Sequence, residues 1–374
     1  MIKVVEAISD TNIGGAGVLL LNRLENTDRR IIDTTVIIPK GSELKNRFFK
    51  LGVRVVEINC GKDSSFDIKT LAAYIYVIKK LSPDILSSHG SLNSRIAGIL
   101  TGVPSCIYTR HCVYPVSGIY KIPPIRFLFG KATDLLSERV VAVSYSAKQN
   151  LTEMGVNPDK INVIINGAKE LKSLDKAQRS ELKKRLMIPQ DSTVVAIYAR
   201  LEACKDHKTF LRAARLLCSR DSNYRFLIVG KGSLAGVLSE YCKRLGISDK
   251  VIFTGFVEDI SPYMNITDIN VNCSIGTETS SLALSEGMSL SVPAVASNYG
   301  GNPYMIKNGI NGYIYRSGDF RDLANKIEIA KKNHRILGEK SRIRFENELN
   351  AASMTQKMQT LYINLYNENK KRYD

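Results

Sequence analysis

The sequence predicts an α/β protein with two doubly wound, Rossmann-like domains, and three observations predict this class. Short apolar runs alternate with segments of about ten residues that have helical spacing, which is typical of βαβ units and parallel sheets. This rhythm stops near Asn166-Gly167 and then starts again. With 374 residues, the chain is too long for one ordinary core, so two domains are expected.

The first half of the chain contains seven expected strands. They lie at residues 2–8, 34–38, 53–58, 85–88, 106–109, 140–143 and 161–165. The expected helices between them lie at residues 18–24, 43–51, 68–81, 94–100 and 146–154. Parallel strands need helical crossovers of this kind, so the order of the segments indicates a doubly wound sheet.

The second half repeats the pattern after a polar stretch at 169–179, which is expected to be a linker followed by the start of a helix. Its expected strands lie at residues 194–198, 225–229, 251–253, 269–272 and 294–296. Its expected helices lie at residues 208–218, 235–245 and 281–288, and the chain is helical again from about Phe320. We therefore expect domains at 1–168 and 169–350 that face a central cleft. A helix at 351–374, with an apolar stripe, is expected to pack back on the first domain.

The composition is that of a folded protein in a reducing compartment. Hydrophobic residues make up 44% and charged residues 24% of the chain. The seven cysteines include no C-x-x-C pair, which argues against a disulfide framework or a zinc site. The N-terminal segment has no signal-peptide pattern, and no apolar run is long enough to span a membrane, so a cytoplasmic protein is expected.

The net charge of +17 is spread over both halves of the chain and does not form one basic tail. Nucleic acid, an anionic membrane face and phosphate-bearing small molecules are all compatible with this charge. We find no nucleic-acid-binding motif, so no nucleic-acid partner is expected.

A glycine-rich loop follows the first expected strand and contains Gly14, Gly15 and Gly17. Glycines at this place let backbone N–H groups approach a phosphate at a helix N-terminus. The loop does not match G-x-G-x-x-G, so a nicotinamide-dinucleotide site is poorly supported. A plain tight turn is as compatible with this loop as a phosphate contact.

Two cations follow the first strand of the second domain. Arg200 comes at the carboxyl end of that strand, and Lys205 lies five residues further on, before the next helix. Ligands bind at this edge of open α/β sheets. The pair could therefore neutralise a diphosphate, although ordinary surface charge is the better explanation of the pair taken in isolation.

The stretch from Asn272 to Met288 is the most informative part of the sequence. A strand runs into a loop of small residues, and the loop then begins a helix. Glu278 lies in the loop, and Glu286 lies eight residues later, about two helical turns on. The chain has 18 glutamates, so this spacing alone is weak evidence. The position of the pair between two expected buried strands is what indicates a site.

These residues resemble the retaining glycosyltransferases of family 4, whose fold is called GT-B. That family carries E-x7-E, then G-x-P-V-V-A-S, then a Gly-Gly loop. The counterparts in this chain are Glu278 with Glu286, residues 291–297, and Gly300-Gly301. The resemblance spans the chain, with further matches at 14–17, 143–144, 164–167, 200–205, 229–232, 253–257 and 311–313. It departs at Thr279-Ser280, where the family often has Phe-Gly, so backbone amides would make the contacts there.

The resemblance implies a set of site residues. The implied catalytic residues are Glu278, His111, Arg200 and Lys205. The implied donor-binding residues are Gly14, Gly15, Gly17, Arg200, Lys205, Gly230, Val257, Thr279, Ser280, Ser281, Leu282, Ala283 and Glu286. In this scheme the cations hold the diphosphate, Glu286 accepts hydrogen bonds from the ribose, and Glu278 meets a hydroxyl of the donor sugar. Arg110 and His89 are candidates for contact with the acceptor, and a structural role for His111 stays open.

The predicted reaction moves a sugar from a nucleotide-sugar, with a UDP-sugar favoured, to a glycan or lipid-linked acceptor in cell-surface polysaccharide assembly. Retention of the anomeric configuration is expected, with the diphosphate deprotonating the acceptor. The sequence contains no D-x-D pair to hold a metal against a diphosphate, so we expect no metal and no cofactor. Segments 45–50 and 120–131 interleave cations with aromatic residues and suit contact with an anionic membrane, although a core helix is the stronger reading of 45–50.

Two other functions compete with sugar transfer. A nucleotide-sugar epimerase shares this two-domain fold, but its chemistry needs several acid-base groups, and the chain has only four histidines. Incubation of the donor without an acceptor would distinguish the two, because an epimerase would interconvert it. A basic, non-enzymatic binding protein is the other alternative, and a filter-binding test with DNA would detect it.

Overall fold

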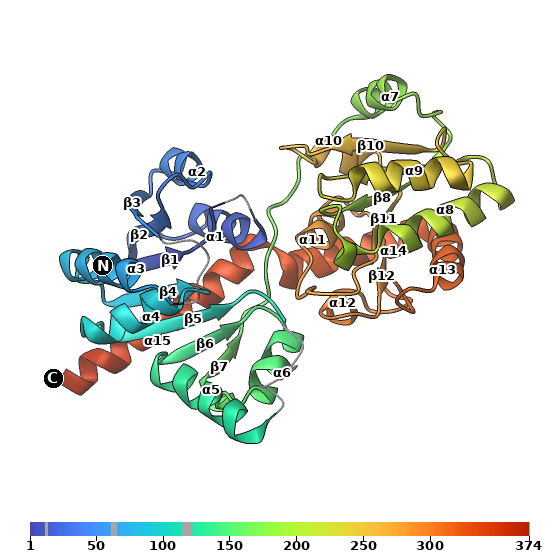
Figure 1. Cartoon of the computed structure of the whole chain (residues 1–374). Helices are drawn as coiled ribbons and strands as arrows, with labels where there is room; N and C mark the ends of the chain where they lie inside the picture. The colour runs from blue at the N-terminus through green and yellow to red at the C-terminus, as the bar shows by residue number, and fades with distance from the viewer. Residues whose placement is uncertain (12–13, 61–65, 114–121, 374) are drawn as a thin grey trace. The chain divides into compact units, whose positions relative to one another are not determined.

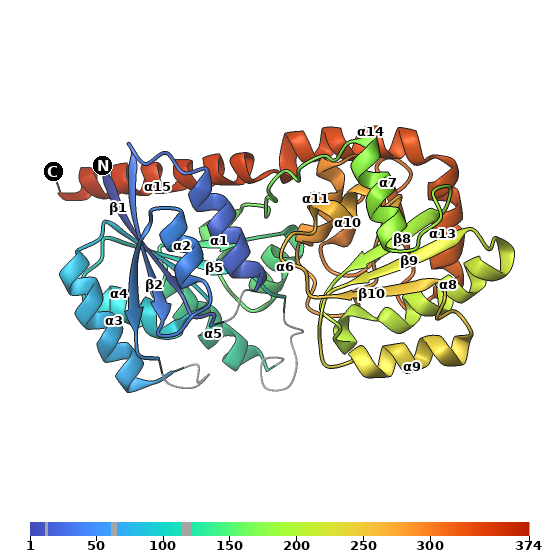
Figure 2. The same ribbon diagram turned by 90° about the horizontal axis from the view of Figure 1, so that it is seen from above.

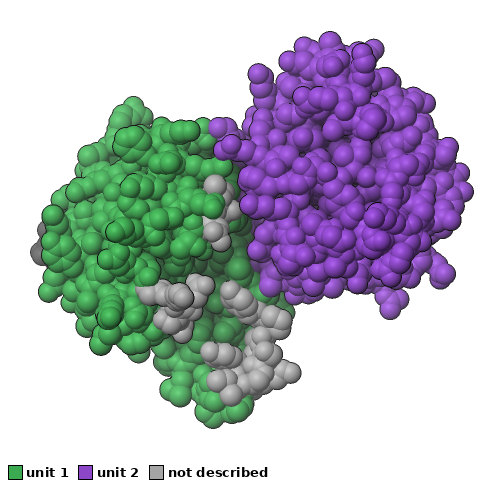
Figure 3. Space-filling model, turned by 45° about the horizontal axis from the view of Figure 1, so that its top comes forward, with its two compact units in different colours: residues 1–167, 351–374 green, residues 168–350 purple. Residues whose placement is uncertain are grey.

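The computed structural model describes residues 1–11, 14–60, 66–113 and 122–373 (Figure 1). The chain divides into two compact units (Figure 3). The first contains residues 1–167 together with 351–374, and the second contains residues 168–350. The chain therefore leaves the first unit after Gly167 and returns to it at Ala351.

The first unit is built on a seven-stranded parallel sheet. The strands are β1 (Ile2–Ile8), β2 (Ile32–Pro39), β3 (Arg54–Ile58), β4 (Ile85–His89), β5 (Ser105–Arg110), β6 (Arg139–Ala142) and β7 (Ile161–Val163), in the spatial order β3-β2-β1-β4-β5-β6-β7. The order reverses direction between β1 and β4, which is the switch point of a doubly wound sheet.

Seven helices of the first unit are described. They are α1 (Gly15–Glu25), α2 (Lys45–Lys50), α3 (Ile68–Leu81), α4 (Leu92–Leu100), α5 (Pro123–Leu135), α6 (Tyr145–Glu153) and the C-terminal α15 (Ala351–Tyr373). Helix α15 runs along α1, β1 and β5 (Figure 2). It buries Leu361, Tyr362 and Leu365, the apolar stripe that the sequence shows, and this burial ties the end of the chain to its beginning.

The second unit has a six-stranded parallel sheet. Its strands are β8 (Thr193–Tyr198), β9 (Tyr224–Val229), β10 (Val251–Gly255), β11 (Ile269–Asn272), β12 (Ala294–Ser297) and β13 (Gly312–Tyr315), in the order β10-β9-β8-β11-β12-β13. Its described helices are α7 (Lys176–Arg185), α8 (His207–Arg220), α9 (Ala235–Leu245), α10 (Ser261–Asn265), α11 (Leu282–Ser289), α12 (Asn302–Met305), α13 (Phe320–Lys332) and α14 (His334–Arg344), followed by a π-helical turn at Phe345–Leu349. The switch point lies between β8 and β11.

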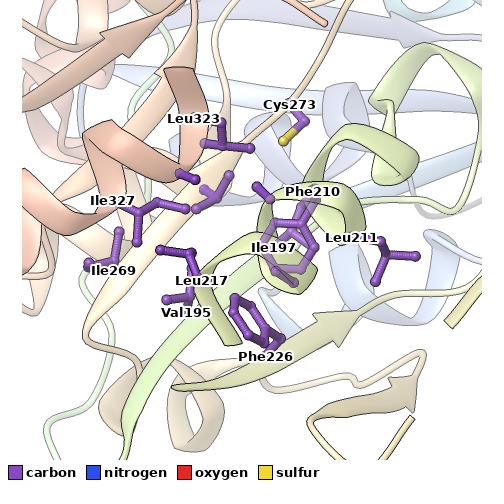
Figure 4. Close-up of a cluster of buried hydrophobic side chains, with 14 of the residues drawn as sticks. Val195, Ile197, Phe210, Leu211, Leu217, Phe226, Ile269, Cys273, Leu323 and Ile327 are labelled. Atoms are coloured by element: carbon purple, nitrogen blue, oxygen red, sulfur yellow. The ribbon is translucent and has the colours of Figure 1, made fainter. Parts of the chain in front are cut away.

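The core of the second unit lies between its central strands and helices α8 and α13 (Figure 4). Val195 and Ile197 on β8 and Val271 on β11 meet Phe210 on α8 and Ile327 on α13. The rings of Phe210 and Phe226 pack edge to face, with centroids 5.8 Å apart. These fully buried strands explain why the sequence shows continuous apolar runs and not strict alternation.

The prediction of two doubly wound α/β domains is confirmed, and helices α3 and α9 have the predicted bounds. The sequence reading missed α5 as a helix and β13 as a strand. Helix α5 begins with Pro123-Pro124 and contains Gly130, residue types that weaken a helix signal in the sequence. Strand β13 has four residues and begins at Gly312, a residue type that weakens any strand signal.

Candidate active site

A cluster of polar side chains lies at the carboxyl ends of β8 and β11, on either side of the switch point of the second sheet. Lys205 follows β8, and Glu278 follows β11. The Nζ atom of Lys205 lies 2.7 Å from Oε2 of Glu278 and 3.2 Å from Oγ of Ser274. The same carboxylate oxygen accepts from Ser274 Oγ at 2.8 Å and from Asn272 Nδ2 at 3.2 Å. Four side chains therefore converge where α/β sheets bind ligands.

Glu278 is an ionised group inside the protein, with only 8% of its side chain exposed. Burial by itself would raise the pKa of this carboxyl, but the charge of Lys205 and the hydrogen bonds from Lys205, Ser274 and Asn272 outweigh it and lower the pKa. A buried carboxylate persists when charge and hydrogen bonds compensate for lost water. Glu278 is thus a fixed hydrogen-bond acceptor at neutral pH.

Glu286 has the opposite electrostatic state. It lies on α11, two turns from the loop, and its side chain is partly buried. Burial raises its pKa to about 7, and among the described residues no cation compensates this loss of water. The two glutamates of the sequence motif are therefore not equivalent in the free protein. Glu278 is held ionised, whereas Glu286 is poised to gain or lose a proton near neutral pH.

The loop before α11 is held by close backbone packing. A Cβ at Gly300 would lie 2.0 Å from the carbonyl oxygen of Glu278, and a Cβ at Gly301 would lie 1.6 Å from that of Thr279. Gly300 also has φ +59°, in the left-handed region. The predicted Gly-Gly loop is therefore the surface against which the Glu278 backbone packs.

The start of α11 offers the predicted N–H groups. Ser281 is the N-cap, and its Oγ accepts from the N–H of Leu284. The N–H groups of Leu282 and Ala283 have no intrahelical acceptor because they belong to the first turn of the helix. The N–H of Ser281 donates to the sulfur of Met305 at 3.2 Å, which is a weak acceptor. Thr279, Ser280 and Ser281 are all buried beside this turn.

The remaining predicted residues of the second unit lie at neighbouring strand ends. Arg200 is exposed just after β8. Gly230 follows β9 with φ +146°, and a Cβ there would lie 2.1 Å from the carbonyl oxygen of Ala199. Gly230 is thus needed for the close approach of the segment that carries Arg200. Val257 follows β10 and packs on the hydrophobic cluster beneath that strand.

The glycine loop of the first unit has a mixed role. Gly14 is the N-cap of α1, and Gly15 has open space around its Cα. A Cβ at Gly17 would lie 2.7 Å from the side chain of Leu44, so this glycine serves the packing of α1 against its neighbour. Residues 12–13 of the predicted loop lie outside the described residues.

His89 and His111 form a direct contact in the first unit. His89 ends β4, and His111 follows β5. Nδ1 of His89 lies 2.8 Å from Nε2 of His111, and the rings stack with centroids 5.1 Å apart. Burial, with the charges of His89 and Arg23, holds the pKa of His111 well below its usual value. Both histidines therefore belong to one buried polar group.

Arg110 does not join the histidines. Its guanidinium contacts the hydroxyl of Tyr108 at 3.1 Å, the carbonyl of Cys112 at 2.9 Å and the side-chain oxygen of Asn150 at 3.3 Å. These contacts hold the chain that leads into His111, and Arg110 is itself buried. The structure therefore gives Arg110 a supporting position, while its predicted contact with an acceptor stays a prediction.

Sequence reasoning missed three residues of this group: Glu6 on β1, Arg23 on α1 and Tyr362 on α15. Oε2 of Glu6 lies 2.9 Å from Nε2 of His89, and Oε1 accepts from the hydroxyl of Tyr362 at 2.8 Å and pairs with Arg23. Burial would raise the pKa of Glu6, but Arg23, His89 and Tyr362 outweigh it and lower it to about 2. A charged residue inside the apolar run of β1 was the available signal. Arg23 and Tyr362 gave none, because they come from distant parts of the chain.

No group of three or more His, Cys, Asp or Glu side chains suited to a metal ion is found within the described ranges. Among the described helices, none has the length and apolar character needed to cross a membrane.

The fold and these polar strand ends define an α/β protein of two sheet units, each with a candidate binding edge. Residues 178–348 match the family model for glycosyl transferases group 1, and residues 13–169 match that for glycosyltransferase family 4. The chain therefore belongs to the family 4 glycosyltransferases of GT-B fold, as its motifs predicted.

Two relatives cover most of the chain. A UDP-Gal:alpha-D-GlcNAc-diphosphoundecaprenol alpha-1,3-galactosyltransferase from Escherichia coli is 26% identical over 316 residues, 80% of each chain. The capsular polysaccharide biosynthesis glycosyltransferase CapM from Staphylococcus aureus is 22% identical and covers 92% of this chain and 93% of that one.

Solved structures show the same fold. Anabaena HepE in complex with UDP matches with a TM-score of 0.83 and 18% identity, over 96% of this chain and 99% of that chain. A glycosyltransferase from Rickettsia africae matches with a TM-score of 0.82 and 21% identity, over 97% and 98% of the two chains.

Proposed function

We propose that this protein transfers a sugar from a UDP-sugar to a glycan or lipid-linked acceptor in the assembly of a cell-surface polysaccharide. The observation that carries the proposal is the cluster of Lys205, Glu278, Ser274 and Asn272 at the switch point of the second sheet. Family membership supports transfer, and the donor class is supported by the UDP-Gal in the name of the E. coli relative and by the UDP bound to HepE.

Lys205 has the capacity to bind a diphosphate while it holds Glu278. An ammonium group has three N–H donors, and Glu278 and Ser274 accept two of them. The third donor is left for a phosphate oxygen, and the exposed Arg200 brings a second positive charge to the same edge. A phosphate oxygen at the start of α11 would replace the weak sulfur acceptor of Ser281 and meet the N–H groups of Leu282 and Ala283.

Glu286 and Glu278 take different parts in donor binding. Glu286, as a carboxylate, accepts hydrogen bonds from the ribose hydroxyls, which would replace the water that burial removes from this side chain. Glu278 accepts a hydrogen bond from a hydroxyl of the donor sugar. Its Oε2 atom already accepts three hydrogen bonds, which disperse its negative charge and make it a poor nucleophile.

A poor nucleophile at Glu278 favours retention without a covalent glycosyl-enzyme. In the proposed step the bond between the anomeric carbon and the diphosphate breaks, and Lys205 and Arg200 stabilise the departing negative charge. The acceptor oxygen then forms the new bond on the same face and gives its proton to the diphosphate. NMR of the product's anomeric configuration tests this step, and an inverted product would contradict it.

A thermal-shift screen with UDP-, GDP- and ADP-sugars tests the donor. We expect stabilisation by a UDP-sugar in the wild type and its loss in Lys205→Met. Lys243→Met is the matched control, because Lys243 lies in an exposed ion pair with Glu240 on α9. Transfer that continues in EDTA is expected, since the proposed charge neutralisation needs no metal. Loss of transfer in EDTA, restored by a divalent cation, would overturn that part.

Helix α5 supports peripheral contact of the first unit with an anionic membrane. Ile122, Phe127, Leu128 and Leu135 expose 48–76% of their surface. Phe127, Lys131 and Leu135 share a helix face, because they are spaced four residues apart. The Nζ of Lys131 lies 5.5 Å from the Phe127 ring. Apolar side chains beside a cation are what an interfacial helix presents to anionic lipid.

The two basic segments singled out in the sequence differ in the structure. In α2, Phe48 is buried in the core, so that segment is partly a core helix, although Phe49 is exposed. Residues 120–121 of the second segment lie outside the described residues. Flotation with vesicles of phosphatidylcholine, with and without phosphatidylglycerol, tests the membrane contact. Binding that ignores both the anionic lipid and the salt concentration would contradict it.

A further inference from the structure

The buried polar group of the first unit is a continuous chain of hydrogen bonds. It runs from Glu6 Oε2 to His89 Nε2 at 2.9 Å, and from His89 Nδ1 to His111 Nε2 at 2.8 Å. Glu6 and His89 expose 1% and 7% of their surface. Both nitrogens of the central imidazole are therefore engaged within the protein, one by a carboxylate and one by the second imidazole.

The chemistry of these atoms decides where the hydrogens lie. Glu6 is ionised, because its pKa is lowered to about 2, and a carboxylate only accepts hydrogen bonds. Nε2 of His89 must then carry a hydrogen. When both imidazoles are neutral, the other nitrogen of His89, Nδ1, has no hydrogen and acts as an acceptor. Nε2 of His111 must in turn be the donor, which leaves Nδ1 of His111 as the ring nitrogen without a hydrogen.

We propose that Glu6 and His89 are positioning residues for His111, and that they fix His111 as the tautomer with its hydrogen on Nε2. In this tautomer Nδ1 is the hydrogen-bond acceptor of the His111 ring. A carboxylate that orients one imidazole is a common device of enzyme sites. Here the carboxylate acts on the second imidazole through the first.

Two further residues hold Glu6 in the orientation that this requires. The hydroxyl of Tyr362 donates to Oε1 of Glu6 at 2.8 Å, and Nη1 of Arg23 donates to the Tyr362 hydroxyl at 2.8 Å. Arg23 also pairs with Oε1. Tyr362 and Arg23 both contact Oε1 of Glu6, whereas His89 contacts Oε2. Tyr362 lies on α15, so the C-terminal helix contributes to a site formed by the first 111 residues of the chain.

The surroundings strengthen this chain of hydrogen bonds. A small cavity of about 30 Å³ borders His89, His111 and Thr109. Most of its other lining residues are apolar, namely Leu19, Leu20, Val141, Val143, Ile164, Met354 and Met358. Hydrogen bonds are electrostatically stronger in such low-dielectric surroundings, so a wrong tautomer is costly.

Nitrogen NMR of the imidazoles tests the positioning directly. The chain has four histidines, so each signal can be assigned by substitution. At pH 8 we expect His111 in the Nε2–H form in the wild type. Glu6→Gln offers an amide N–H to His89 Nε2, which reverses both tautomers and moves the hydrogen of His111 to Nδ1. His89→Gln keeps Glu6 with Arg23 and Tyr362 and should leave His111 as a tautomer mixture. An unchanged His111 tautomer in both variants would overturn the proposal.

The kinetic test rests on the proposed function, and a failure of the positioning can be distinguished from a failure of that function. If His111 serves transfer, Glu6→Gln and His89→Gln should lower kcat by about 10-fold or more, with little change in the KM for the donor. Tyr74→Phe is the control, because it removes a hydroxyl from a separate buried cluster of the same unit and should change neither readout. If the His111 tautomer is reversed and kcat does not change, Glu6 and His89 still position His111, but His111 takes no part in the reaction. A wild type inactive with every UDP-sugar would overturn the proposed function, while the NMR result would still decide the positioning.

Discussion

Glu286→Gln should stabilise the second unit at alkaline pH while it weakens donor binding. The folded protein binds the Glu286 proton more tightly than the unfolded chain, because burial raises the pKa from 4.5 to about 7. Stability is therefore lost as the pH rises from about 4.5 to about 7, and the loss is complete above that range. Glutamine resembles the protonated acid in shape and carries no charge, so the variant avoids this loss.

The size of the effect follows from the two pKa values. A difference of about 2.5 units corresponds to about 3 kcal/mol at pH 8. At pH 5 most of the folded protein is protonated at Glu286, and the expected gain falls to about 1 kcal/mol. For a unit of this size, about 3 kcal/mol raises the melting temperature by about 6–12 °C.

Scanning calorimetry at pH 5 and pH 8 measures this difference. Glu339→Gln is the matched control, because its exposed ion pair with Arg335 should contribute little at either pH. A Glu286→Gln variant that is destabilised at pH 8, or equally stabilised at both pH values, would refute the assignment of a buried, uncompensated carboxyl. The same variant should bind the UDP-sugar more weakly, since an amide cannot accept two hydroxyl hydrogen bonds as a carboxylate does.

Three further results are expected. Glu278→Gln should destabilise the second unit by about 3–5 kcal/mol at pH 7, because it leaves the Lys205 charge without its carboxylate. Because folding lowers this pKa from 4.5, the loss should shrink as the pH falls below that value in urea titrations. Gly301→Ala should displace the Thr279 backbone, cost about 1–3 kcal/mol and abolish the thermal shift with UDP-sugar; a normal shift would refute this packing role. Replacing Phe127 and Leu128 with serine should reduce flotation with anionic vesicles at least several-fold, whereas transfer to a water-soluble acceptor should not change. If flotation is not reduced, α5 is not the segment that contacts the membrane.

Glu286 is expected to lower the stability of the free protein and yet to strengthen donor binding, and both effects have the same physical origin. A carboxylate that meets no cation in the free protein is stabilised only when a ligand supplies hydrogen bonds. Glu278 obtains these contacts from its own chain, through Lys205, Ser274 and Asn272. One glutamate is therefore preorganised, whereas the other is completed by the donor.

Local patterns determined most of the fold. The period of apolar residues placed α3 and α9 at their observed bounds, and the run of small residues placed Glu278 at the end of a buried strand. These signals are available in sequence because helices and strands depend on neighbours within a few positions. The local signal failed for α5, because Pro123-Pro124 and Gly130 indicate a loop, whereas Gly130 in the folded chain serves a close approach to Gly155.

The charge states and the histidine chain were decided only by the tertiary structure. Glu278 and Glu286 look alike in the sequence, and their pKa values separate because Lys205 reaches one and not the other. The orientation of Glu6 depends on Tyr362, which lies 356 positions later in the chain and donates a hydrogen bond to it. Burial and long-range contact set these properties, and no pattern of neighbouring residues encodes them. Sequence identified the candidate residues, and folding determined which of them are ionised, oriented and held together.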